Sequence, residues 1–290
     1  MPRSDATTLS IARADDRPIR DVAETVKAYR VRGARTAPID AAVAAEVPIA
    51  LAYNGTSHVV MMATPADLAD FALGFSLSEG ILADTGELHE IAVEDGEDGV
   101  EIALDVAPHA NDRLSDRRRN MTGRTGCGLC GVDELVQVAR PLGRVGVGQR
   151  IEIGAVHKAL DALRDHQAIN QKTGAVHAAA WAGIDGAIIL VREDVGRHNA
   201  LDKLIGAMAR AGIDFQSGFA VITSRCSFEM VQKAVTVNIP FLVAISAPTT
   251  MALRIAERAG LTLVALARSD SVTAYANPGR IAGLEKTDAS

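Results

Sequence analysis

The stretch from Phe219 to Ala267 reads FAVITSRCSFEMVQKAVTVNIPFLVAISAPTTMALRIAERAGLTLVALA, and it decides the fold. Short apolar runs of strand length alternate in it with segments that repeat apolar residues at helical spacing. The runs are 219–224, 240–246 and 261–267, and the helical segments are 228–238 and 249–260. Strands that are apolar on both sides and alternate with helices are typical of a sheet covered by helices on both faces. The sequence therefore predicts an α/β sandwich here.

The same alternation begins further upstream. We expect helices over 132–142 and 154–170, strands over 174–182 and 186–193, and a helix over 199–212. Together with the first stretch, these segments place one α/β domain over residues 119–290, with the sequence GCGLCG (126–131) at its start.

A smaller unit precedes this domain. Residues 47–64 predict two strands joined at Asn54-Gly55, a dipeptide favoured in two-residue hairpin turns. A helix follows over 64–80, with Thr64 as its cap and Gly80 just past its last turn. Residues 87–106 predict a second hairpin around an acidic turn. We therefore expect a β-β-α-β-β unit in a small α+β domain over 39–118, after a flexible N-terminal arm over 1–38.

Residues 108–126 are polar and interrupt the pattern. They carry five arginines, at positions 113, 117, 118, 119 and 124. The segment is interpreted either as a solvated linker or as a lid that attracts anions.

Composition excludes several classes of protein. The 290 residues carry a formal net charge of −6, which argues against a general nucleic-acid binder. No run of about 18 apolar residues could span a membrane, and the N-terminus has no apolar signal segment. Three cysteines, an odd number, do not form a disulfide framework. We expect a cytoplasmic protein with reduced thiols.

Two of the three cysteines, Cys127 and Cys130, lie three positions apart among glycines. A structural zinc site needs four ligands, but Cys226 stands alone in the sequence and the H-x-E pattern of zinc deaminases is missing. The pair precedes a predicted helix, whose positive end lowers a thiol pKa, and Arg124 adds to this effect. These features favour a reactive thiol over two small residues in a packed turn. The spacing fits both sulfur transfer through a persulfide and disulfide exchange.

Polar residues follow three of the predicted strands. They are Asp194, Arg197, His198 and Asn199 in the first turn, Ser224, Arg225 and Ser227 in the second, and Thr249 and Thr250 in the third. Ligands bind open α/β sheets at the carboxyl ends of strands, and helix N-termini attract anions. The turns therefore predict an anion or phosphate site. The alternative is that Asn199 caps its helix and Arg197 pairs with Asp194.

His177 lies in an apolar predicted strand. It is interpreted as a core residue or, as the alternative, as a functional one.

These segments together resemble the formate dehydrogenase accessory sulfur-carrier family, FdhD. The matching stretches, in family order over about residues 45–283, are ATPADLADFALGFSLSEGIL, GCGLCG, VHAAA, EDVGRHNALDKLIG, SRCSFEMVQKA, SAPTTMALRIAERAGLTLVALAR and YANPGRI. The resemblance implies a fold similar to the cytidine deaminases without their zinc site, hence no bound metal, and a homodimer.

The resemblance also implies a function. The family takes persulfide sulfur from a cysteine desulfurase and transfers it to the molybdenum bis(molybdopterin guanine dinucleotide) cofactor, its cargo, before insertion into apo-formate dehydrogenase. Cys127 would carry the persulfide and Cys130 would be its partner. The matching cofactor-binding residues are Leu266, Ala267, Arg268, Ser269, Asp270 and Ser271, with Leu266 and Ser269 standing where the family often has an aromatic residue and a glycine. A guanine nucleotide could mimic the cofactor.

Two other functions stay open at this point. One is a chaperone that shelters the cofactor and docks the apo-enzyme without sulfur chemistry. The other is a thiol-disulfide oxidoreductase that uses Cys127 and Cys130.

Overall fold

The computed structural model of the chain describes residues 18–121, 142–268 and 270–284. The apolar runs of the second half form a six-stranded sheet in the order β13-β12-β11-β10-β8-β9. Its strands are β8 (His177–Gly183), β9 (Ile188–Asp194), β10 (Gly218–Ile222), β11 (Phe241–Ala244), β12 (Thr262–Ala265) and β13 (Thr273–Ala276). Strands β10, β11 and β12 are parallel, whereas β13, β8 and β9 each pair antiparallel with their inner neighbour.

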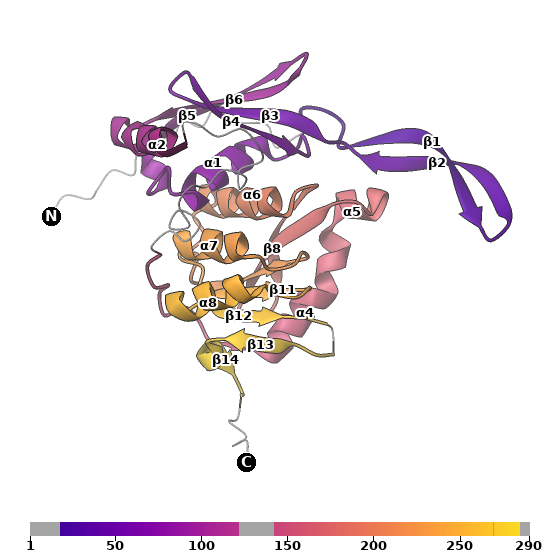
Figure 1. The fold of residues 1–290 in the computed structure, drawn as a ribbon. Coiled ribbons are helices and arrows are strands. Elements are labelled where there is room, and N and C mark those ends of the chain that lie inside the picture. Colours follow the sequence, from indigo (N-terminus) through magenta and orange to yellow (C-terminus); the bar gives the residue numbers. More distant parts are fainter. Residues whose placement is uncertain (1–17, 122–141, 269, 285–290) are drawn as a thin grey trace.

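Helices cover both faces of this sheet (Figure 1). Because side chains alternate along a strand, neighbouring residues such as Val221 and Ile222 enter different hydrophobic clusters. One cluster joins the sheet to α4 (Ile153–Leu163), and the other joins it to α6 (Arg197–Arg210), α7 (Phe228–Thr236) and α8 (Thr250–Ala259). The predicted α/β sandwich is confirmed. Its likeness to cytidine deaminases stays a prediction.

The smaller unit is a four-stranded sheet with one helix. Strands β3 (Val47–Tyr53), β4 (Thr56–Ala63), β5 (Leu88–Gly96) and β6 (Gly99–Val106) pair in the order β4-β3-β6-β5, with β3 and β6 parallel in the centre. Helix α1 (Leu68–Ser78) lies between the first and second hairpins in sequence. Asn54 and Gly55 have φ of 46° and 74°, as the predicted hairpin turn requires. The predicted β-β-α-β-β order is confirmed.

The two units meet where α1 lies against α6 (Figure 1). A Cβ atom on Gly74 would lie 1.7 Å from the backbone oxygen of Asp202, and one on Gly206 would lie 1.9 Å from that of Asp70. Only glycine allows this approach, because any side chain would overlap the opposite helix. The helices therefore pack backbone against backbone.

Buried charges also join the units. The Asp70 carboxylate of α1 forms ion pairs with the guanidinium groups of Arg192, at 2.8 Å, and Arg210, at 2.7 Å. Asp202 of α6 lies 2.9 Å from Lys233 Nζ and accepts a 2.6 Å hydrogen bond from the hydroxyl of Ser78. A buried carboxylate is tolerated only when such partners compensate its lost hydration. Asp70 therefore depends on arginines of the larger unit, and Asp202 takes one of its partners, Ser78, from the smaller unit.

The N-terminal region differs from its prediction. Strands β1 (Ala23–Arg32) and β2 (Arg35–Ala44) form a two-stranded antiparallel ribbon that projects from the body (Figure 1). Fifteen of the 20 ribbon residues are exposed and none is buried, so the apolar–polar alternation that marks a strand is missing. Residues 23–38 of the predicted N-terminal arm thus form regular strands that the sequence did not indicate, and residues 1–17 lie outside the described part. The flexibility of the arm stays a prediction.

Two local predictions also fail. Residues 108–121 form helix α2 (Pro108–Met121) where a linker or lid was the interpretation, and Arg113 in it donates to Ile81 O at 2.8 Å and contacts Glu87. Thr64 does not cap α1, whose N-cap is Asp67. Instead the Thr64 hydroxyl accepts a 3.1 Å hydrogen bond from Val195 N, because the units pack together there.

The remaining elements are short. They are η1 (Thr85–Glu87), β7 (Ile151–Glu152), η2 (Arg164–His166), α5 (Ala168–Thr173), η3 (Pro278–Arg280) and β14 (Ile281–Ala282). The helix predicted over 154–170 is therefore broken into three pieces, and the one predicted over 132–142 lies almost wholly outside the described residues. The domain limits at 38 and 118 stay predictions. In the described ranges no helix has the length and apolar character needed to cross a membrane.

Candidate functional site

The predicted polar turns meet at one edge of the six-stranded sheet. The parallel strands β10, β11 and β12 all end there, and β9 ends there too because it runs antiparallel to β8, which runs antiparallel to β10. His177 lies at the same edge as the first residue of β8. The strand-end edge, as we call it, therefore gathers His177 and the turns after β9, β10, β11 and β12.

Backbone hydrogen bonds hold three of these turns side by side. Thr249 N donates to Cys226 O at 3.0 Å, and Cys226 N donates to Ala247 O at 3.2 Å. Leu266 N donates to Ser246 O at 3.3 Å. The turn after β12 is thereby placed next to the turn after β11.

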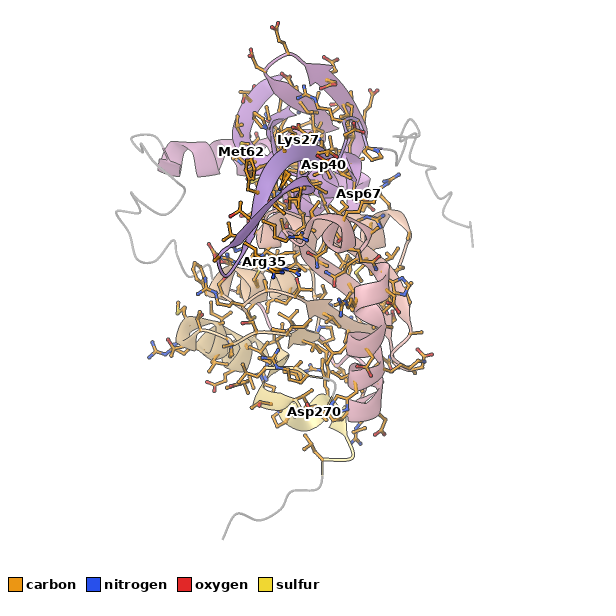
Figure 2. The ribbon with its side chains drawn as sticks, turned by 90° about the vertical axis from the view of Figure 1, so that its right-hand side faces the viewer. Lys27, Arg35, Asp40, Met62, Asp67 and Asp270 are labelled. Carbon is orange, nitrogen blue, oxygen red and sulfur yellow. The ribbon has the colours of Figure 1, made fainter. Side chains whose placement is uncertain are left out.

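The structure places most of the residues assigned to the cofactor. The exposed residues are Leu266, Arg268, Asp270 and Ser271. Ala267 is buried in the hydrophobic cluster that joins the sheet to α4. Figure 2 shows Asp270 on the side of the molecule from which the ribbon also projects. Leu266 has φ of 50°, a conformation that is unfavourable for a leucine and is common at functional turns. Ser269 lies outside the described residues.

The alternative interpretation of the turn after β9 was that Arg197 pairs with Asp194 and that Asn199 caps the helix, and both parts are wrong. Asp194 does not pair with Arg197: its side chain lies 2.7 Å from Lys203 Nζ, and it accepts hydrogen bonds from Thr64 N at 3.0 Å and Gly196 N at 2.7 Å. Asn199 does not cap the helix either, since the N-cap is Gly196 and Asn199 donates to Met62 O at 2.9 Å. Arg197 is thus left available at the edge.

Two histidines lie near Arg197. His198 Nε2 is 3.1 Å from Glu229 Oε2, and that hydrogen bond is the main reason the pKa of Glu229 is held below its ordinary value. His177 Nδ1 is 3.4 Å from the hydroxyl of Thr223. Burial, and then the cationic groups of Arg197 and His198, lower the pKa of His177. The His177 side chain itself is half-buried at the edge, rather than fully packed in the core.

The helix starts at this edge differ in capping. Helices α6 and α7 have no side-chain hydrogen bond at their N-caps, Gly196 and Ser227. Helix α8 is capped, since Thr249 Oγ1 accepts from Ala252 N at 3.3 Å. Uncapped N-termini offer backbone N–H groups to an anion. The structure therefore supports two of the three predicted anion-attracting helix starts.

Sequence reasoning missed Thr223, Lys203 and Glu229. Glu229 stands two residues after Ser227, whose hydroxyl donates to it at 3.0 Å, in the first turn of α7. An acidic residue in a first turn is a common helix signal, so nothing in the sequence marked it as a partner of His198.

Cys127, Cys130 and Arg124 lie outside the described residues. Cys226 is buried at the start of the turn before α7, and burial raises the pKa of its thiol to about 12. Burial therefore disfavours the reactive thiolate form of Cys226, which fits its exclusion from the predicted thiol pair. In the described ranges no three His, Cys, Asp or Glu side chains gather as metal ligands would.

We expect iodoacetamide at pH 8 to modify Cys127 and Cys130 in the folded protein and to leave Cys226 unmodified. A thiol with a pKa of about 12 has roughly one thiolate per ten thousand molecules at that pH. Peptide mass mapping before and after addition of guanidinium chloride measures this. Labelling of Cys226 in the folded state at the rate of a free thiol would contradict it.

The fold and the edge together define an α/β sandwich protein whose strand-end turns collect arginine and histidine side chains beside uncapped helix N-termini. Comparison with known proteins gives the family. A model of the FdhD/NarQ family matches residues 44–282, and the chain belongs to that family. The resemblance seen in the sequence is confirmed.

Individual relatives agree. The chain is 52% identical over 252 residues to the sulfur carrier protein FdhD of Xanthomonas oryzae pv. oryzae (strain MAFF 311018), covering 87% of this chain and 90% of the relative. It is 52% identical over 242 residues to that of Variovorax paradoxus (strain S110), covering 83% and 87%. A crystal structure from Desulfotalea psychrophila, assigned as a formate dehydrogenase accessory protein, superposes with a TM-score of 0.70 at 23% identity, over 90% of this chain and all of the other.

Proposed function

We propose that this protein is a sulfur carrier that serves a formate dehydrogenase. It accepts sulfur from a cysteine desulfurase on Cys127 and delivers it to the molybdenum bis(molybdopterin guanine dinucleotide) cofactor before the cofactor enters the apo-enzyme. The observation that carries the proposal is the 52% identity to sulfur carrier proteins over most of the chain.

The chemistry of the first step fits the cysteine pair. The Cys127 thiolate attacks the outer sulfur of the desulfurase persulfide, so that a new sulfur–sulfur bond forms, the old one breaks and its electron pair leaves with the desulfurase thiolate. The product is a persulfide anion, which neighbouring cations such as Arg124 stabilise. Cys130 assists as the second thiol.

The strand-end edge suits the cargo. A cofactor with two guanine dinucleotide arms carries several phosphates, and Arg197, Arg225 and Arg268 lie in the turns of this edge, the last two exposed. The exposed residues of the turn after β12 add polar groups. We include in the proposal a cytoplasmic location and a homodimer.

Incubation of the protein with a cysteine desulfurase and L-cysteine, without thiol reductant, is expected to add about 32 Da to Cys127, the mass of one sulfur atom in a persulfide. Mass spectrometry of the intact protein and of its peptides locates the adduct. Cys226→Ala is the matched control and keeps the adduct, because Cys226 is buried. The proposal fails if wild type gains no sulfur, or if Cys127→Ala gains as much as wild type.

A further inference from the structure

An arginine and two histidines from two elements lie at one end of the strand-end edge. Arg197 and His198 begin α6, and His177 begins β8. Arg197 and His198 both lower the pKa of His177, and Arg197 lowers that of Glu229 on α7. The geometry places these residues together. His177 is the ladder partner of Asp194, which accepts a 2.7 Å hydrogen bond from Gly196 N, the residue before Arg197. His198 Nε2 in turn lies 3.1 Å from Glu229 Oε2.

The carboxylates around this cluster already have partners. Asp194 is neutralised by Lys203 at 2.7 Å, and both side chains are fully buried. Glu193 accepts hydrogen bonds from Ile169 N and Asn170 N, each at 2.8 Å. Glu229 accepts from Ser227 at 3.0 Å and lies 3.1 Å from His198 Nε2. No described carboxylate is paired with Arg197 or His177.

Arg197 has an unused donor. Its Nε atom is buried and has no hydrogen-bond partner among the described residues. A buried guanidinium N–H without an acceptor is costly, and charged donors form their strongest hydrogen bonds with anionic oxygens. The N-terminus of α6, a helix of 14 residues with no side-chain cap, presents further N–H groups beside it.

We infer that Arg197, His177, His198 and the first turn of α6 form a subsite for a pyrophosphate group. The inference rests on the proposed function, and it places one dinucleotide pyrophosphate at the β9–α6 turn, apart from the Leu266–Ser271 stretch. Arg197 gives charge-assisted hydrogen bonds to the phosphate oxygens, and the helix N-terminus gives backbone donors. Glu229 orients His198 through their hydrogen bond.

A bound anion also acts on the protonation of His177. Burial, and then the charges of Arg197 and His198, lower the pKa of His177. Its Nδ1 lies 3.4 Å from the hydroxyl of Thr223, just after β10, and its ladder partner Asp194 is paired with Lys203 at 2.7 Å. A bound pyrophosphate is expected to raise the pKa of His177, since a nearby negative charge favours the protonated imidazole. Binding and protonation of His177 therefore support each other.

The test is isothermal titration calorimetry on the full chain, with inorganic pyrophosphate and GDP as separate probes. Arg197→Gln is expected to raise Kd for both probes about tenfold or more, the loss typical of a hydrogen bond to a charged group. Arg258→Gln is the matched control. It removes an exposed arginine in the last turn of α8 and is expected to change Kd less than about twofold.

The two probes separate the sources of the pyrophosphate. A lower Kd for GDP than for pyrophosphate assigns the subsite to a nucleotide-borne group, and equal values assign it to the free anion. A proton NMR titration of the imidazole signal that His177→Gln removes gives a second readout, and its pKa is expected to rise on addition of pyrophosphate. That rise is not expected if Arg197 acts only in folding.

The inference is overturned if wild type binds neither probe, or if Arg197→Gln and Arg258→Gln bind them equally well. Circular dichroism of each variant confirms that it is folded. The persulfide assay on Cys127 uses no pyrophosphate, so a failed subsite with a normal Cys127 adduct leaves the proposed function in place, and a missing adduct refutes the function independently.

Discussion

Replacement of Lys203 by methionine is expected to lower the free energy of unfolding by about 3–5 kcal/mol, the cost of leaving one charge of a buried pair uncompensated. Lys203 Nζ lies 2.7 Å from Asp194 Oδ2, and neither side chain is exposed. It also donates to Thr64 O at 2.9 Å. The lysine thus holds the β9–α6 turn against the smaller unit, and urea denaturation followed by circular dichroism measures its contribution.

Lys158→Met is the control for this substitution. Lys158 pairs with Asp185 at 3.5 Å on the surface, with side chains 58% and 65% exposed. An exposed pair contributes about 0–1 kcal/mol, so this variant is expected to unfold close to wild type. Equal destabilisation by the two substitutions would contradict the role given to the buried pair.

The second large effect is on function. In a host whose formate dehydrogenase depends on this protein, Cys127→Ala is expected to reduce the enzyme's activity to that of cells without the protein. The reason is that alanine has no thiol to accept sulfur, so the cofactor stays unsulfurated. Formate-dependent dye reduction in cell extracts measures the activity, and immunoblotting confirms equal protein levels.

Cys226→Ala serves as the control and is expected to keep near wild-type activity, since the Cys226 thiol is buried with a pKa of about 12. Full activity of Cys127→Ala would instead identify a chaperone that only shelters the cofactor. Cys130→Ala decides the third possibility: if wild type oxidises a dithiol substrate and this variant does not, the protein is a thiol-disulfide oxidoreductase.

The spacing of apolar residues predicted strands and helices correctly where one side of the element is buried. The α/β alternation from β8 to β12 and the hairpin at Asn54-Gly55 follow the predictions closely. Each of these strands and helices packs against a core, so its apolar residues repeat at the spacing of its own geometry. The polar strand-end turns were predicted for the same reason, because strand direction determines which turns share an edge.

Periodicity failed where no face of an element is buried. Ribbon strands β1 and β2 are largely exposed and show no alternation of apolar and polar residues. Helix α2 is rich in arginine, a good helix former, but its polar composition was interpreted as a linker or lid.

The sequence by itself determined the α/β class, the family and the order of strands and helices from β3 to β6 and from β8 to β12, because short-range spacing and local motifs carry that information. The tertiary structure alone decided which charges pair. Asp194 lies three residues from Arg197 but pairs with Lys203, and Asp70 pairs with arginines more than a hundred residues away. Such choices depend on which side chains are desolvated together when the two units pack, and no local pattern records that.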